Sequence, residues 1–89
     1  VILHLYILNF RVVMYKDTIF NKLAIIFKNI FGADISIADE PKDVDGWDSL
    51  RHIELVNEIE REFNVKFSMK EVLSFVSVKA IVECLSEKI

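Results

Sequence analysis

The chain has 89 residues, enough for one small domain with a core, and a hydrophobic content of 53% excludes a disordered chain. Two Gly and one Pro give too few turn residues for a many-turned β fold. The formal net charge is −3, and residues 34–62 hold ten acids against three bases. This acidic surface either favours basic protein partners and repels nucleic acid, or simply keeps a small protein dissolved.

Residues 1–13 are almost entirely apolar and differ from everything after them. The stretch is too short to span a bilayer, and it lacks the basic region and cleavage site of a signal peptide. We interpret it, with His4, as an upstream extension or a cloning remnant, and residues 14–89 as the domain. The alternative is a docking strand or a membrane-touching segment, whose apolar side chains another copy of the chain could cover.

The first helix is expected from about Asp17 to Phe31. Asp17 is a candidate N-cap, and Gly32 can end the helix in a left-handed conformation. The apolar residues recur at steps of three and four, which places them on one stripe of a helix. They are Ile19, Phe20, Leu23, Ile26, Phe27, Ile30 and Phe31.

A long acidic connection follows, from Gly32 to Trp47. Connections in helix bundles usually run about 2–8 residues, so a longer ordered loop is either functional or fixed by its own side chains. We expect apolar residues to anchor this loop to the domain. They are Ile35, Ile37, Val44 and Trp47.

The segment Asp43-Val44-Asp45-Gly46 of this loop resembles the middle of an EF-hand calcium site. If Gly46 takes loop position six, Pro41 falls at position one and His52 at position twelve. Neither residue supplies the carboxylate that calcium needs there. We therefore expect no metal site in this loop.

The second helix is expected over residues 49–63, with Asp48 or Ser49 as its cap and Asn64 as a left-handed end. Its apolar stripe comprises Leu50, Ile53, Val56, Ile59 and Phe63, and Leu55 widens it. Glu54 and Glu58 share a face, which we interpret as a recognition or solvated face rather than an acid–base pair, because no cleft or metal-ligand spacing accompanies them.

Two more helices complete the chain. The third is short and is expected over residues 69–74. Ser68 and Glu71 form a capping box that marks its start. The fourth covers residues 78–88, with Ser77 as its cap. Together the elements predict an all-α four-helix bundle with three longer helices, one short third helix and a long loop between helices one and two.

Ser49 is the most informative residue, because it lies where the acidic loop becomes a helix. Its hydroxyl is expected to be exposed, and the free N–H groups of a helix start can stabilise an attached phosphodiester. A serine hydrolase also needs a base and an oxyanion hole. The chain offers no glycine-rich loop, and His52, three residues along the helix, is badly aimed at the hydroxyl. We therefore expect Ser49 to be modified rather than to do chemistry.

Cys84 is the single cysteine and cannot form an internal disulfide, which favours a reducing, cytoplasmic setting. No histidine or acid is spaced to activate it. We expect a half-buried helix residue rather than a nucleophile.

At this point the chain resembles the acyl carrier protein family, the carrier domains that bear phosphopantetheine. The matching pieces are Asp48-Ser49-Leu50, the helix over residues 51–63 and the following Val65-Lys66-Phe67. A short third helix and the entry to the fourth, residues 77–81, also match. The resemblance covers about residues 14–89. Asp-Ser-Leu alone is a weak signal, but it is a strong one when it opens the second of four helices after a long loop.

The resemblance implies a mechanism. A phosphopantetheinyl transferase would use the Ser49 hydroxyl to attack the pyrophosphate of coenzyme A, which leaves 4′-phosphopantetheine on Ser49. Asp48 would position the magnesium and the hydroxyl during this transfer. The terminal thiol of the arm would then carry acyl intermediates as thioesters to enzymes of fatty acid, polyketide or related biosynthesis. The chain itself would be a carrier and not an enzyme.

The resemblance also implies partners. By position, Leu50, Ile53, Glu54 and Glu60 would face basic docking patches on acyl-loading and acyl-processing enzymes. We expect a monomer that neither binds nucleic acid nor spans a membrane.

The chain departs from the fatty acid carriers at three positions: Arg51 and Arg61 stand where those carriers have acids, and Asn57 replaces a larger apolar residue. With Trp47 before Asp48, this looks more like a discrete carrier of a specialised pathway. Two alternatives stay open, a helical protein-interaction module in which Ser49 is only a cap, and a small serine enzyme.

Overall fold

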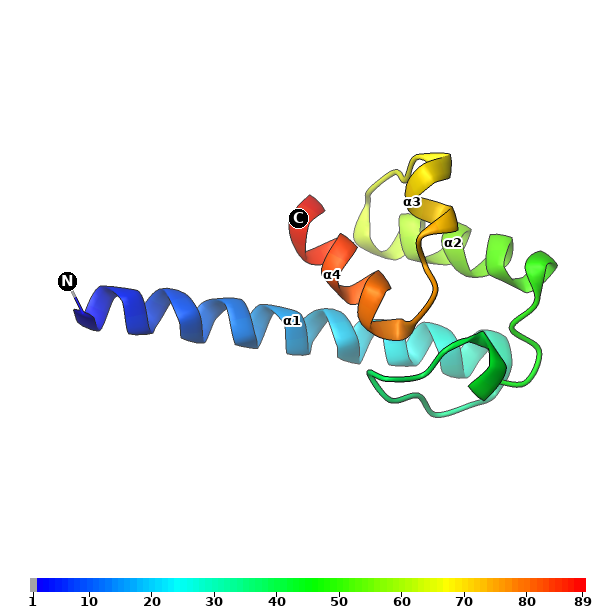
Figure 1. Ribbon diagram of the computed structural model, residues 1–89, viewed down its shortest axis with the longest axis horizontal. Helices are drawn as coiled ribbons and strands as arrows, with labels where there is room; N and C mark the ends of the chain where they lie inside the picture. The colour runs from blue at the N-terminus through cyan, green and yellow to red at the C-terminus, as the bar shows by residue number, and fades with distance from the viewer. Residues whose placement is uncertain (1) are drawn as a thin grey trace.

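The computed structural model describes the backbone of residues 2–89 and the side chains of residues 15–89. It contains four α-helices, α1 (Ile2–Phe31), α2 (Ser49–Phe63), α3 (Met69–Leu73) and α4 (Val78–Lys88), and a short 3₁₀ helix, η1 (Pro41–Asp43). No strand occurs in residues 2–89. The prediction of an all-α fold with three longer helices and a short third one is confirmed (Figure 1).

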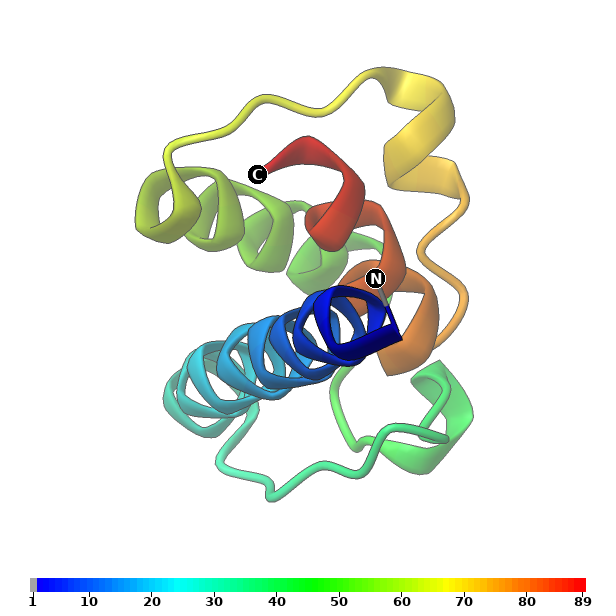
Figure 2. The same ribbon diagram turned by 90° about the vertical axis from the view of Figure 1, so that its left-hand side faces the viewer.

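α2 and α4 pack against the C-terminal half of α1, and α3 lies on the far side of them from α1 (Figures 1 and 2). No residue within α3 is buried, although Phe75, just after it, belongs to the core. Within the part of the chain that the structure describes, no helix is long and apolar enough to cross a membrane.

α1 begins much earlier than the sequence predicts. The helix is continuous from Ile2 to Phe31, so Asp17 lies inside it and the prediction that Asp17 caps it is wrong. The sequence pattern missed this because residues 1–13 are apolar almost throughout and show no one-sided stripe. Gly32 ends the helix as predicted, with φ +67° and its N–H donating to the Lys28 carbonyl at 2.9 Å.

The N-terminal part of α1 extends beyond the other three helices (Figure 1). The side chains of residues 2–14, including His4, and the whole of residue 1 lie outside the described residues. The interpretation of residues 1–13 as an extension therefore stays a prediction.

The other helices begin as predicted, because each has a side-chain cap. Asp48 accepts from the Arg51 N–H, and Ser77 accepts from the Ala80 N–H. Ser68 and Glu71 form the expected capping box ahead of α3, which ends one residue before the predicted Ser74. Asn64 closes α2 in a left-handed conformation, with φ 54°.

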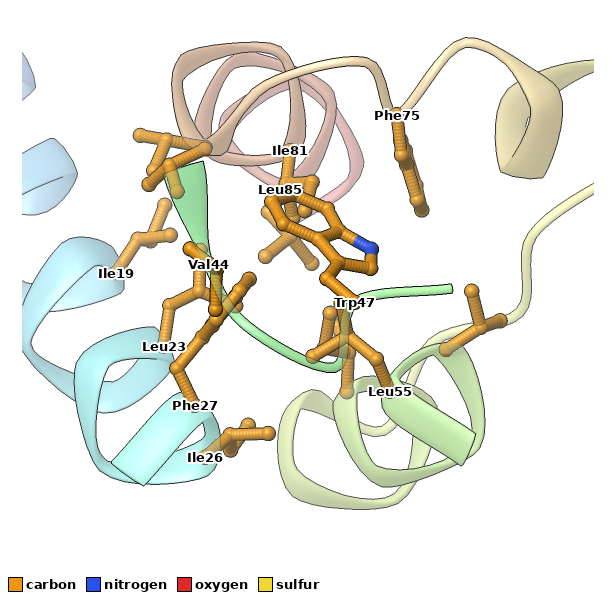
Figure 3. Packing of buried hydrophobic residues seen from close by; sticks show 14 residues of the cluster. Ile19, Leu23, Ile26, Phe27, Val44, Trp47, Leu55, Phe75, Ile81 and Leu85 are labelled. Atoms are coloured by element: carbon orange, nitrogen blue, oxygen red, sulfur yellow. The ribbon is translucent and has the colours of Figure 1, made fainter. Parts of the chain in front are cut away.

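The core lies between α1, α2 and α4, and Trp47 of the loop reaches its centre (Figure 3). Trp47 is 6% exposed, and its ring meets the Phe27 ring edge-on with centroids 5.1 Å apart. Edge-to-face aromatic pairs of this kind add to the stabilisation from buried area. The buried residues are Ile19, Leu23, Ile26, Phe27, Val44, Trp47, Leu55, Val56, Ile59, Phe75, Val78, Ile81, Val82 and Leu85.

The loop between α1 and α2 is anchored partly as predicted. Val44 and Trp47 are buried and Ile35 packs against the core, but the prediction for Ile37 is wrong because its side chain is exposed. The backbone supplies the missing anchor. The Ile37 and Asp39 carbonyls accept from the N–H groups of residues 79 and 78, at 3.0 and 2.9 Å. The loop thus satisfies two of the N–H groups that the start of α4 leaves without helical partners.

Glu71 joins α3 to α4. Its carboxylate accepts from the Ser68 N–H at 2.8 Å and lies 3.2 Å from the Lys88 ammonium nitrogen. The Ser68 N–H bond and the Lys88 contact lower the pKa of Glu71 to about 2. Burial and the Glu71 carboxylate, 3.5 Å from its sulfur, raise the pKa of the Cys84 thiol to about 11. Cys84 is half-buried, as predicted, and is held as an unreactive thiol.

The Glu71 contacts predict a pH-dependent contribution to stability. A carboxyl whose folded pKa is depressed stabilises the fold above its unfolded pKa, near 4.5, and loses that contribution as pH falls toward 2. We expect Glu71→Gln to lower the urea midpoint at pH 7 and to approach the wild-type midpoint at pH 2–3. Glu87→Gln, an exposed change in α4, is the control. A difference between Glu71→Gln and wild type that stays constant over this range would contradict the assignment.

Candidate functional site

Ser49 is the first residue of α2, and its side chain is exposed. No hydrogen bond among the described residues uses its hydroxyl oxygen. The first N–H groups of a helix lack intrahelical partners and carry the positive end of the helix dipole. A phosphate ester on Ser49 would therefore lie where its charge is stabilised and where nothing blocks an attached arm.

Asp48 is the N-cap of α2, in an extended conformation with φ −104° and ψ −175°. One carboxylate oxygen accepts from the Arg51 N–H at 2.8 Å, while the other makes no hydrogen bond within the described residues. Asp48 thus fixes the start of the helix and keeps one oxygen open beside Ser49. That oxygen could contact a cation during a transfer reaction.

His52 makes no hydrogen bond to Ser49. It bonds instead to the Trp47 indole and to the Val72 carbonyl, at 2.9 and 3.0 Å. This arrangement removes it as a base for the Ser49 hydroxyl. Sequence reasoning missed these bonds: the one available signal was Trp47, five residues earlier, because Val72 contributes a backbone atom.

A groove of about 620 Å³ opens beside Ser49, between α2, α3 and the loop. Around it lies an exposed apolar surface from two helices and the segment after α3, which we call the α2–α3 surface. Leu50, three residues before Ile53 on α2, is 81% exposed. Exposed apolar patches of this kind mark interaction sites. The surface comprises Leu50, Ile53, Met69, Leu73 and Val76.

The four residues predicted to face partners divide into two groups. Leu50, Ile53 and Glu54 are exposed on α2. The Glu60 side chain is only 17% exposed, and it accepts from the Phe67 N–H at 2.9 Å. Glu60 therefore holds the segment after α2 in place, and the structure does not bring it to the surface with the other three.

The three departures from fatty acid carriers have different local roles. Arg51 donates to the Ile30 carbonyl at 2.8 Å, so it caps the last turn of α1 and joins it to the start of α2. Arg61 pairs with Glu58 at 2.8 Å on the surface, where such pairs contribute little stability. Asn57 is exposed.

The acidic loop uses its carboxylates for its own turns. Asp43 accepts from the Glu40 N–H at 3.0 Å, and Asp39 accepts from the Ser36 N–H at 2.8 Å. Over residues 15–89 the structure contains no group of three His, Cys, Asp or Glu side chains that could hold a metal ion.

The chain was also compared with known protein families. A family model described as the phosphopantetheine attachment site matches residues 21–85. The matched range includes Ser49, its N-cap Asp48, the groove, all of α2 and α3, the C-terminal part of α1 and most of α4. A search among curated proteins found no match.

Proposed function

Because the chain belongs to the phosphopantetheine attachment-site family, we propose that it is a discrete acyl carrier protein modified at Ser49. The cofactor of this family is 4′-phosphopantetheine, which its members hold covalently. The observation that carries the proposal is an exposed serine with a free hydroxyl at the start of α2. The chain then supplies the folded domain that partner enzymes bind, and the arm supplies the thiol that bears acyl intermediates.

The described residues fit this group. The Ser49 hydroxyl is accessible to a transferase, Asp48 keeps one carboxylate oxygen open, and the helix start favours the negative charge of a phosphodiester. In the transfer, the Ser49 oxygen would lose its proton to a base of the transferase and form a bond to the phosphorus of coenzyme A that bears pantetheine. The bond from this phosphorus to the nucleotide phosphate would break, and adenosine 3′,5′-bisphosphate would leave. Asp48 would orient the hydroxyl and the magnesium that the transferase uses.

The partners follow from the exposed part of α2. Carrier domains of this family work with transferases and with biosynthetic enzymes. For this chain we assign partner contact to Leu50, Ile53 and Glu54, which suit docking patches with a basic rim and an apolar centre. The same proposal includes a role in fatty acid, polyketide or related biosynthesis. It also includes a cytoplasmic location, a monomeric state and a carrier domain that covers residues 14–89.

Intact mass measurement tests the proposal. The full chain is incubated with a promiscuous phosphopantetheinyl transferase, magnesium and coenzyme A. We expect a gain of one phosphopantetheine group, located by fragmentation to the peptide that contains Ser49. A protein-interaction module predicts no gain, and a serine enzyme predicts turnover of an ester substrate without any attached group. An unchanged mass would overturn the carrier proposal.

Substitutions of Asp48 can separate its role as the N-cap of α2 from its proposed role in the transfer reaction. Ser and Asp are about equally good N-caps, whereas an Ala at this position costs about 1 kcal/mol of stability. We expect Asp48→Ser to keep the urea midpoint of the wild type but to slow modification about tenfold to a hundredfold, as when a group that orients a metal site is lost. Asp48→Ala should lower the urea midpoint and also slow the modification.

The matched control is Ser77→Asp, which exchanges the same two residue types at the N-cap of α4. It should alter neither the modification rate nor, to within a few tenths of a kcal/mol, the stability. Modification of Asp48→Ser at the wild-type rate would contradict the role assigned to Asp48.

A further inference from the structure

His52 connects the loop that precedes Ser49 to α3. Its Nδ1 accepts from the Trp47 indole N–H at 2.9 Å, and its Nε2 lies 3.0 Å from the Val72 carbonyl oxygen. An indole N–H can only donate and a carbonyl oxygen can only accept. The imidazole tautomer that carries its proton on Nε2 therefore satisfies both bonds at once. The Trp47 and His52 rings are nearly parallel, 16° apart with centroids separated by 6.1 Å, as expected for two rings joined edge to edge by this hydrogen bond.

α3 needs support from outside itself. It has five residues, far fewer than the roughly 12–15 that an isolated helix needs to be even marginally stable in water. None of its residues is buried. Its described polar links to the other helices are the Glu71 contacts with α4 and the His52 bond to Val72. The His52 bond is thus the polar link between α3 and α2.

The position of α3 determines the shape of the α2–α3 surface. Ile53 of α2 lines the groove beside Ser49 on one side, and Met69 and Leu73 of α3 line it on the other. Trp47 and Val72, the two residues that His52 bonds, both line this groove. An enzyme that contacts both helices meets a surface whose shape depends on where α3 lies, and the His52 bond is one of the contacts that set this position.

We propose that His52 is a positioning residue for the carrier reaction. Its Nε2–H holds α3 in register with α2 and the Ser49 loop, so that a transferase or a later partner enzyme finds the α2–α3 surface preformed. The inference rests on the proposed function, because that function identifies the enzymes that use the surface. His52 itself takes no part in bond making at Ser49.

Three substitutions separate the two hydrogen bonds. His52→Phe keeps an aromatic ring and removes both bonds. His52→Asn keeps an acceptor near Nδ1 for Trp47, and His52→Gln keeps a donor near Nε2 for Val72. Glu62→Gln, an exposed change at the other end of α2, is the control. Each full-length variant is assayed as the substrate of the transferase, well below its unfolding temperature.

We expect His52→Phe and His52→Asn to raise the transferase KM for the carrier about five- to tenfold, the factor expected when one hydrogen bond no longer holds the recognised form. The kcat should stay unchanged, because Ser49 and its Asp48 cap are intact. Amide hydrogen exchange in α3 should accelerate by a similar factor. His52→Gln and Glu62→Gln should behave like the wild type in both measurements.

The inference is overturned if His52→Phe shows the wild-type KM and wild-type exchange in α3, or if His52→Gln is as defective as His52→Phe. A wild-type chain that gains no phosphopantetheine would contradict the proposed function instead. In that case the exchange rates of the same variants would still decide whether His52 holds α3.

Discussion

Ser49→Ala is expected to abolish the gain of phosphopantetheine completely and to leave the fold intact. The hydroxyl oxygen is the atom that would bond to phosphorus, and no hydrogen bond among the described residues depends on it. Alanine at the first position of a helix is well tolerated, so the unfolding free energy should change by less than about 0.5 kcal/mol. Intact mass after transferase treatment and the urea midpoint are the two measurements.

Ser68→Ala is the matched control, because Ser68 also lies at the start of a helix. Its hydroxyl accepts from the Glu71 N–H at 3.1 Å, and this N-cap should be worth about 1 kcal/mol. We expect Ser68→Ala to be less stable than wild type and still fully modified. A mass gain that persists in Ser49→Ala would move the attachment site elsewhere in the chain.

Phe27→Ala is expected to cause the largest loss of stability. The Phe27 side chain is fully buried, at 0% exposure, and contacts the rings of Phe31 and Trp47 with centroid distances of 5.3 and 5.1 Å. Truncating such a phenylalanine costs about 3–5 kcal/mol, because the cavity is only partly filled by relaxation. Small domains have a free energy of unfolding of about 5–15 kcal/mol, so this substitution would remove a large part of it.

Ile25→Ala, two residues away on the same helix, is the control for this substitution. Ile25 is 62% exposed, and its truncation should change the unfolding free energy by about 0.5 kcal/mol or less. Urea unfolding with a shared m-value distinguishes the two variants. Equal midpoints for Phe27→Ala and Ile25→Ala would show that the contacts of Phe27 with Phe31 and Trp47 do not stabilise the core.

The parts of the fold that the sequence predicted are those that depend on local signals. α2 begins and ends at the predicted residues because Asp48 caps it and Asn64 closes it within a few residues of the helix. The start of α1 was missed because an evenly apolar stretch contains neither a cap nor a stripe. The η1 helix was missed as well, since Pro41 within an acidic run reads simply as loop.

In the candidate site, too, the features that follow from neighbouring residues were predicted and those that depend on distant residues were not. The placement of Ser49 at a helix start follows from the residues next to it, so the sequence predicted the exposed position. The surroundings of His52, Glu60 and Arg51 could not be predicted, because each of them bonds to a backbone atom of a distant residue: Val72, Phe67 and Ile30. A backbone carbonyl or N–H has no residue signature, and only the packing of helices brings it within reach.

The two backbone bonds between the loop and the start of α4 affect when the site can form during synthesis of the chain on the ribosome. The N–H groups of residues 78 and 79 leave the ribosome after Ser49 itself, yet they hold Ile37 and Asp39 of the loop that leads to Ser49. Single domains fold as units, so this loop reaches its final form only after translation of α4 is complete. A nascent chain that already displays Ser49 but lacks α4 would still lack the folded surroundings that a transferase recognises, so loading would wait for α4.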